Sequence, residues 1–407
     1  MTEPLSIPGN EFVDDALSRR NAIILAGAQT LYGAIALVNI SMGGLIGQAL
    51  AENKALATLP ITTFVLGTAM TTIPASLFMK RVGRRIGFLC GAGFGLISAL
   101  LSIVAIYEGS FWLFCLATFI NGFYQAFAQF YRFAAADVAS PDFKPKAISW
   151  VMIGGLVAAF VGPQVIIQTK DMLAPVLFAG VYVSTAVLTS LALILLTFVN
   201  LPMHVEPAGR STARPISAIM AQPKFIVAVV CAMLTYGIMN LVMTATPIAM
   251  IACGFSIDDA AFVIQWHVVA MFAPSFFTGN LISRFGARMV ILAGMVMLTG
   301  CGIVALMGIE LEHFWVALVL LGLGWNFGFV GGTSLVTETY FPAERAKVQA
   351  ANDFLVFGTV ALASLSSGVL LQFFGWDSVN IALFPLVCIA ILLIAWLIWV
   401  EKREAMA

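Results

Sequence analysis

Four residues with soft metal-binding side chains are spaced one helical turn apart in two consecutive apolar segments. Met239 and Met243 lie in the first segment, and His267 and Met271 lie in the next. Because residues i and i+4 share one face of a helix, we expect both pairs to point into one cavity between their helices. Thioether sulfur and imidazole nitrogen together suit a soft monovalent metal such as Cu(I). The four residues therefore predict a copper site.

The residues around this group are weaker candidates for the same chemistry. Gln265 and Trp266 precede the histidine and offer a hydrogen-bond donor and a stacking face, and Asn240 on the other segment is a candidate partner for the second ring nitrogen. Cys231 and Cys253 flank the methionine pair and could relay Cu(I) along the helix. Packed, inert thiols are an equally good interpretation of both cysteines.

The rest of the chain is a succession of apolar segments. It is 61% hydrophobic and 10% charged, against about 45–50% and 25% in soluble domains. A helix needs about 20 apolar residues to cross a bilayer, so we predict an all-α membrane protein with twelve transmembrane helices and the lipid bilayer as a partner. No phosphate-binding loop, catalytic triad or zinc motif is present, so we expect neither an enzyme nor a nucleic-acid partner. The predicted spans are residues 22–48, 56–79, 86–107, 111–135, 147–169, 173–200, 222–251, 260–282, 289–309, 313–336, 347–373 and 377–400.

Charged residues alternate between the two sides of this predicted topology. Loops on one side carry nearly all the Arg and Lys residues, whereas the opposite loops carry mainly acids such as Glu52 and Glu310. Cationic loops stay in the cytoplasm, so both termini are predicted to be cytoplasmic. The acidic outer face would raise the local concentration of a cation.

Two motifs recur in the two halves of the chain at nearly the same offset. The first joins the second and third predicted spans and recurs between the eighth and ninth, and the second follows the fourth and tenth spans. Duplicated halves are one way in which transporters are built, with the substrate site between them. We predict two six-helix bundles, residues 1–201 and 222–407, related by a pseudo-two-fold axis and joined by a cytoplasmic linker at 202–221. The matched residues are Arg81, Gly83 and Arg85 with Arg284, Gly286 and Arg288, and Asp137 with Glu338.

The first of these loops resembles the signature loop of the major facilitator superfamily. Arg81, Gly83, Arg84 and Arg85 match its basic and glycine positions, whereas Lys80 stands where the family has an acid. The resemblance covers the whole chain and implies the twelve-helix fold of that superfamily. It also implies that both copies of the loop take part in the conformational switch of transport.

The two soft-ligand pairs resemble the signature of one branch of that superfamily, the CcoA-like bacterial copper importers. Met239, Met243, His267 and Met271 match its four positions, and the two cysteines resemble cysteines of that branch. The resemblance implies import of copper, as substrate and not as cofactor, across the bacterial inner membrane for haem–copper oxidase assembly. A copper chaperone or oxidase assembly factors are the implied partners.

Polar residues elsewhere in the predicted spans have structural explanations. Arg132 lies near the cytoplasmic end of its span and can pair with Asp137, and Glu338 lies near the inner end of the tenth span. Trp325 and Asn326 stand among glycines, a pattern typical of close helix packing. Two alternatives to copper import stay open: a proton-coupled transporter of a small organic solute, and a copper-binding membrane sensor or scaffold that transports nothing.

Overall fold

The computed structural model describes residues 15–135, 139–140, 143–201, 214–341 and 344–406, and every regular element in these ranges is helical. Most of the helices are long enough to cross a membrane. The elements are α1 (Asp15–Leu50), η1 (Lys54–Leu56), α2 (Leu59–Val82), α3 (Arg84–Tyr107), α4 (Phe111–Ala128), α5 (Tyr131–Ala135), α6 (Lys144–Thr169), α7 (Ala179–Leu196), α8 (Ile216–Met220), α9 (Pro223–Ala252), α10 (Ile257–Phe272), α11 (Ser275–Phe285), α12 (Ala287–Met307), α13 (Leu311–Thr337), α14 (Arg345–Ile381) and α15 (Leu383–Met406).

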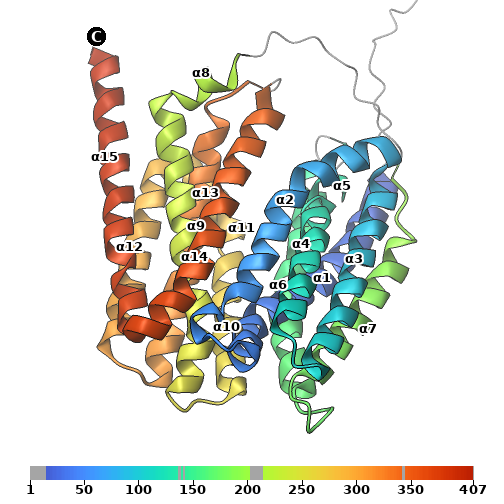
Figure 1. Cartoon of the computed structure of the whole chain (residues 1–407). Coiled ribbons are helices and arrows are strands. Elements are labelled where there is room, and N and C mark those ends of the chain that lie inside the picture. The colour runs from blue at the N-terminus through green and yellow to red at the C-terminus, as the bar shows by residue number, and fades with distance from the viewer. Residues whose placement is uncertain (1–14, 136–138, 141–142, 202–213, 342–343, 407) are drawn as a thin grey trace, which may run out of the picture.

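The number of membrane crossings agrees with the prediction of twelve. In the described ranges ten helical segments are long and apolar enough to cross, and the bent pair α10–α11 brings the number to eleven. One of these segments, Lys347–Arg403, is 57 residues long, about 85 Å at 1.5 Å per residue, or nearly three times the thickness of a bilayer core. It breaks at Gly375, where φ is 78°, and α14 and α15 run in opposite directions from there (Figure 1). This segment therefore contains two spans.

The break between α10 and α11 is compensated by α13. Pro274 has no backbone N–H, and the helix axis bends by 41°. The amide nitrogen of Asn326 on α13 donates hydrogen bonds to the carbonyl of Met271 and to the hydroxyl of Ser275, both at 2.7 Å. Thr278 in turn donates to the side-chain oxygen of Asn326 at 2.6 Å. Asn326 thus supplies a hydrogen bond to a backbone carbonyl at the bend. In a membrane interior there is no water to do so.

The helices form two bundles, one of α1–α7 and one of α9–α15 (Figure 1). We call the face at which α1 begins and α15 ends the terminal face, and the other the opposite face. The linker of residues 202–213 lies outside the described residues. Where the chain resumes, the guanidinium of Arg214 donates to the buried carboxylate of Glu344 at 2.7 Å, which holds the pKa of Glu344 at about 2.

The duplicated loop has the same backbone in both bundles. Gly83 joins α2 to α3 with φ 89° and ψ 152°, and Gly286 joins α11 to α12 with φ 81° and ψ 152°. A positive φ favours glycine, so the glycine in both copies has a conformational reason. The repeat detected in the sequence is therefore also a repeat in the backbone.

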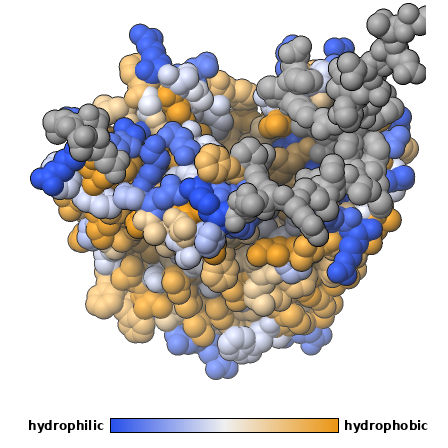
Figure 2. Space-filling view, turned by 90° about the horizontal axis from the view of Figure 1, so that it is seen from above, coloured by the Kyte–Doolittle hydropathy of each residue, from blue (hydrophilic) through white to orange (hydrophobic). Residues whose placement is uncertain are grey.

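The surface is that of a multi-pass membrane protein. Large apolar side chains point outward on many spans; Trp112, Val296, Leu362 and Phe374 are each at least 68% exposed. Viewed onto the terminal face, charged residues gather over the helix ends and hydrophobic residues cover the flanks (Figure 2). Such an apolar flank suits contact with lipid.

Candidate functional site

The four residues predicted to bind copper lie in the interior of the second bundle. Met239, Met243 and His267 are at most 3% exposed, and Met271 is 7% exposed. Nδ1 of His267 donates a hydrogen bond of 2.8 Å to the carbonyl of Leu318 on α13, so Nε2 keeps its lone pair; it has no partner among the described residues. The helix α10 packs mainly on α13 and α6, whereas α9 packs mainly on α14 and α13. Joint binding of an ion by the four side chains stays a prediction.

The three polar residues predicted to assist this group make contacts of their own. The side-chain oxygen of Asn240 accepts a hydrogen bond from Thr244, one turn along α9, at 3.4 Å. Trp266 makes an edge contact with Trp315 on α13, with ring centroids 6.3 Å apart, and Gln265 is half-buried. These contacts give Asn240 and Trp266 packing roles within the second bundle.

The two cysteines lie at different levels of α9. Cys231 is fully buried, with its sulfur 4.0 Å from the carbonyl of Ala390 on α15. Cys253 caps α9 at the opposite face and is exposed. At 1.5 Å per residue they stand about 33 Å apart along the helix, so an ion could not pass directly from one thiol to the other.

The basic residues of the duplicated loops hold helix ends together within each bundle. Arg85 donates to the carbonyl of Thr197 at 2.6 Å, and Arg288 donates to Glu401 at 2.5 Å. Arg284 lies over the ring of Phe285. Arg81 is exposed and Arg84 half-buried. Movement of these loops during transport stays a prediction.

The pairing of Arg132 with Asp137 stays a prediction. Asp137 lies outside the described residues. The Arg132 side chain is exposed, lies over the ring of Phe133 and is attracted by the charge of Asp353 on α14. Arg132 and Asp353 belong to different bundles, and their opposite charges attract across the interface. Glu338 instead bonds to Lys224 of its own bundle at 3.0 Å.

The two bundles are in close contact near the opposite face. The hydroxyl of Thr58 donates to the carbonyl of Ser364 on α14 at 2.8 Å, and Lys170 pairs with Asp258. A Cβ on Gly368 would lie only 2.5 Å from the hydroxyl oxygen of Thr58. Only glycine allows the first bundle and α14 to approach so closely at this level.

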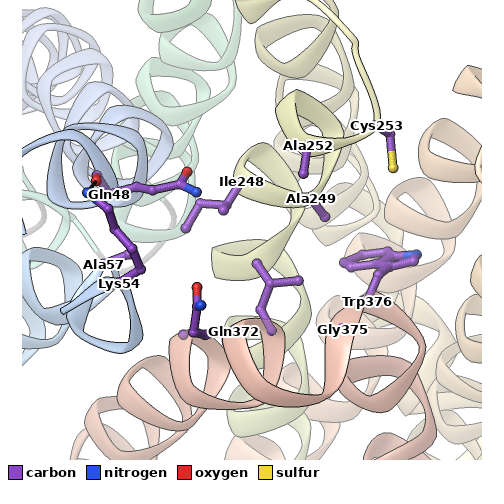
Figure 3. Close-up of a pocket in the computed structure, with 12 residues that line it drawn as sticks. Gln48, Lys54, Ala57, Ile248, Ala249, Ala252, Cys253, Gln372, Gly375 and Trp376 are labelled. Atoms are coloured by element: carbon purple, nitrogen blue, oxygen red, sulfur yellow. Dashed lines mark hydrogen bonds between the residues drawn. The ribbon is translucent and has the colours of Figure 1, made fainter.

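A pocket of about 290 Å³ lies within this closed region, between the end of α1 and the kink of α14. Gln48 and Lys54 line one side, and Cys253 and Trp376 line the other (Figure 3). The ammonium of Lys54 donates to the carbonyls of Gln48 and Ala51 at 2.6 and 2.8 Å. Lys54 thus caps the end of α1.

Aromatic side chains gather halfway across the second bundle. We call Tyr236 of α9, Trp325 and Phe329 of α13, and Phe357 of α14 the aromatic group. The rings of Trp325 and Phe329 stack at 5.2 Å and 14°, and Tyr236 contacts Trp325, Phe329 and Phe357 at 5.4, 5.1 and 6.0 Å. Tyr236, Trp325 and Phe357 lie about 18–20 Å from the terminal ends of their helices. This is the middle of the membrane.

A tyrosine of the first bundle lies near this group. The rings of Tyr32 on α1 and Tyr124 on α4 meet edge to face at 5.0 Å, and Tyr32 is close enough to Tyr236 for their hydroxyls to interact electrostatically. Tyr32 of the first bundle and Tyr236 of the second therefore lie near each other at mid-membrane. Flat aromatic molecules stack on such rings.

Partial exposure of these side chains indicates a cleft on the terminal side. Most of the apolar part of α9 is enclosed by other helices, yet Tyr236 keeps part of its surface accessible, as do Phe329 and Phe357. At the terminal face, the hydrogen bonds from Ser18 to Ala135 and from Lys224 to Glu338 each join elements of one bundle. The bundles meet at the opposite face, and their helix ends lie further apart at the terminal face (Figure 1).

Comparison with known proteins identifies the family. The sequence model described as Major Facilitator Superfamily matches residues 24–273 and 228–407. The riboflavin transporter RfnT of Brucella anthropi is 47% identical over 396 residues, which are 97% of this chain and 99% of that protein. The uncharacterized MFS-type transporter YdeG of Bacillus subtilis is 28% identical over 95% of this chain and 93% of its own length. The crystal structure of a point mutant of the nucleoside transporter NupG superposes with a TM-score of 0.75 at 13% identity, over 93% of this chain and 99% of that one.

The prediction of copper import is wrong. A full-length relative at 47% identity transports riboflavin, an organic molecule, and that finding supports the alternative of an organic solute transporter. The resemblance to copper importers depended on four side chains, and methionine is also a common packing residue in apolar cores. Similarity along the whole chain outweighs a four-residue motif.

Proposed function

The chain belongs to the major facilitator superfamily and is a transporter, not an enzyme; within that family we propose that it carries riboflavin across the membrane. The observation that supports this substrate most strongly is the 47% identity to a riboflavin transporter over 97% of the chain. Riboflavin is a flat three-ring isoalloxazine with a polyhydroxyl ribityl tail. It needs an apolar stacking surface and separate polar groups.

The aromatic group is suited to the isoalloxazine ring. Tyr236, Phe329 and Phe357 keep part of their surface accessible at mid-membrane, whereas Trp325 is 7% exposed and stacks on Phe329. Stacking of a base on an aromatic side chain contributes about 1–3 kcal/mol, and the three-ring flavin offers at least as large a face. Trp325 is also a potential donor, because its indole nitrogen has no partner among the described residues.

We assign the terminal face to the cytoplasm of a bacterial inner membrane. The excess of Arg and Lys in the loops of that face favours this orientation. With contact between the bundles near the opposite face, the conformation is open to the cytoplasm. Rocking of the bundles about the mid-membrane site would then expose the same site to the outside, which is alternating access.

Uptake by riboflavin-auxotrophic bacteria tests the proposal. Cells lacking their own transporter should take up radiolabelled riboflavin and grow on micromolar riboflavin once they produce this chain. Trp325→Ala, present in the membrane at an equal level, should restore neither, whereas Met220→Leu, outside the predicted site, should restore both. If wild-type protein is inserted and folded but uptake equals that of empty cells, the proposal is wrong.

A further inference from the structure

We propose that Asp353, Asn352 and Gln125 form a polar subsite beside the aromatic group, which binds the hydroxylated tail of the substrate. This inference rests on the proposed function, because it divides one substrate into a ring and a polyol and assigns each part to its own residues. The tail would lie on the terminal side of the ring.

Asp353 is positioned one turn from the aromatic group. It precedes Phe357 by four residues on α14, so the two side chains share a helix face. It lies about 12 Å from the start of the helix at 1.5 Å per residue. The Asp353 side chain is half-buried. A charged group inside the membrane is costly, so its presence points to a function.

Asn352 orients this carboxylate and leaves a polar atom unused. Its amide nitrogen donates to one oxygen of Asp353 at 3.0 Å, which leaves the other oxygen free to accept from a ligand. Asn352 is 5% exposed, and its own side-chain oxygen has no partner among the described residues. A buried polar atom without a partner costs about 1–3 kcal/mol. A ligand hydroxyl would supply the missing hydrogen bond.

Gln125 offers a third acceptor from the facing bundle. It follows Tyr124, whose ring meets that of Tyr32, and its side-chain oxygen also has no partner in the described part of the chain. Gln125 lies three residues before the end of α4 at Ala128, and α5 with Arg132 follows after a break. The charge of Asp353 attracts Arg132, which places the terminal end of this part of the first bundle near α14.

The chemistry of these atoms favours a polyol. A carboxylate oxygen and two amide oxygens are acceptors, and each hydroxyl of a ribityl chain is a donor. Hydrogen bonds to a charged group contribute about 1.5–3 kcal/mol. Arg132 offsets part of the charge of Asp353, which lowers the electrostatic cost of an acidic site at this depth. The subsite thus selects flavins that carry a hydroxylated tail.

Comparison of riboflavin with lumiflavin, which has a methyl group in place of the tail, tests the subsite. Quenching of flavin fluorescence by purified protein reports binding of each ligand. Wild type should bind riboflavin more tightly than lumiflavin. Asp353→Asn, which keeps the shape of the side chain, should weaken riboflavin binding about tenfold, the loss of one charge-assisted hydrogen bond, and leave lumiflavin binding unchanged within about twofold.

Glu338→Gln is the matched control, because it removes a carboxylate that bonds to Lys224 away from the subsite. This variant should bind riboflavin and lumiflavin as tightly as wild type does. Gln125→Ala tests the same subsite from the other bundle and replaces Asp353→Asn if that variant does not fold. Equal losses for both ligands, or no loss for riboflavin, would overturn the subsite. Failure of wild type to bind any flavin would instead overturn the proposed function.

Discussion

The two halves of the bundle interface differ in what they leave accessible, and α9 passes through both. Tyr236, Asn240 and Met243 share one face of this helix by their spacing. Toward the terminal face the helix presents Tyr236, which is partly exposed beside the cleft. Further along it presents Met243, which is 3% exposed at the level where the bundles close. Side chains of one helix face can thus be available to a substrate or unavailable, according to the spacing of the bundles.

The largest effect on riboflavin transport is expected from a substitution in the accessible half of the bundle interface. Trp325→Ala should lower the apparent affinity for riboflavin about tenfold to a hundredfold, because it removes the ring on which Phe329 stacks and so disrupts a stacking surface worth about 1–3 kcal/mol. Trp325→Phe keeps a ring and should keep most of the activity. Initial uptake rates over a range of riboflavin concentrations measure both variants. Equal losses in the Ala and Phe variants would mean that the ring does not stack on the substrate.

An intermediate effect is expected from a substitution in the closed half of the bundle interface, near the opposite face. Gly368→Val adds bulk where a Cβ would already be 2.5 Å from Thr58. Overpacking of this kind costs about 1–3 kcal/mol, which should weaken contact between the bundles near the opposite face. Cys253, at the end of α9, should then react faster with a thiol reagent added to that side. Gly358→Val, where a Cβ would meet nothing within 4 Å, is the control and should leave the reaction rate of Cys253 unchanged.

The smallest effect is expected from the soft-ligand residues. Met243→Leu preserves volume and should cost less than about 1.5 kcal/mol in packing, with riboflavin uptake within about twofold of wild type. Transport assays at equal protein level measure it. A severe loss of uptake would mean that the substrate site includes Met243 in the closed half of the interface. The two halves would then not differ in their access to substrate.

Much of the fold follows from the sequence. The apolar segments have the length of membrane spans, and Gly83 and Gly286 recur within matching basic loops because both positions need a positive φ. Asn326 was predicted to mark close helix packing, and it bonds across the bend of α10–α11. These features depend on residues near one another in the chain, which is why they can be recognised without the structure.

The proposed substrate site could not be predicted from the sequence in the same way. Tyr236, Trp325 and Phe357 stand in three separate spans, each in an ordinary apolar context, and only the packing of α9, α13 and α14 brings their rings together. Asp353 lies only eight residues from the start of α14, so the sequence alone does not distinguish it from an ordinary charge near a helix end. The methionine and histidine pairs were conspicuous because they are local patterns. The sequence does place aromatic residues in the middle of several predicted spans, which was a possible sign of this site. It does not say which of these residues face one another in the folded protein.

Riboflavin flux into liposomes that contain only the purified protein tests the central claim most directly. Wild-type protein should accumulate radiolabelled riboflavin above protein-free liposomes, excess unlabelled riboflavin should compete, and Trp325→Ala at equal reconstitution should bring the flux close to background. Flux equal to background in folded wild-type protein, or full flux in the Trp325→Ala variant, would contradict a flavin transporter with an aromatic site at mid-membrane.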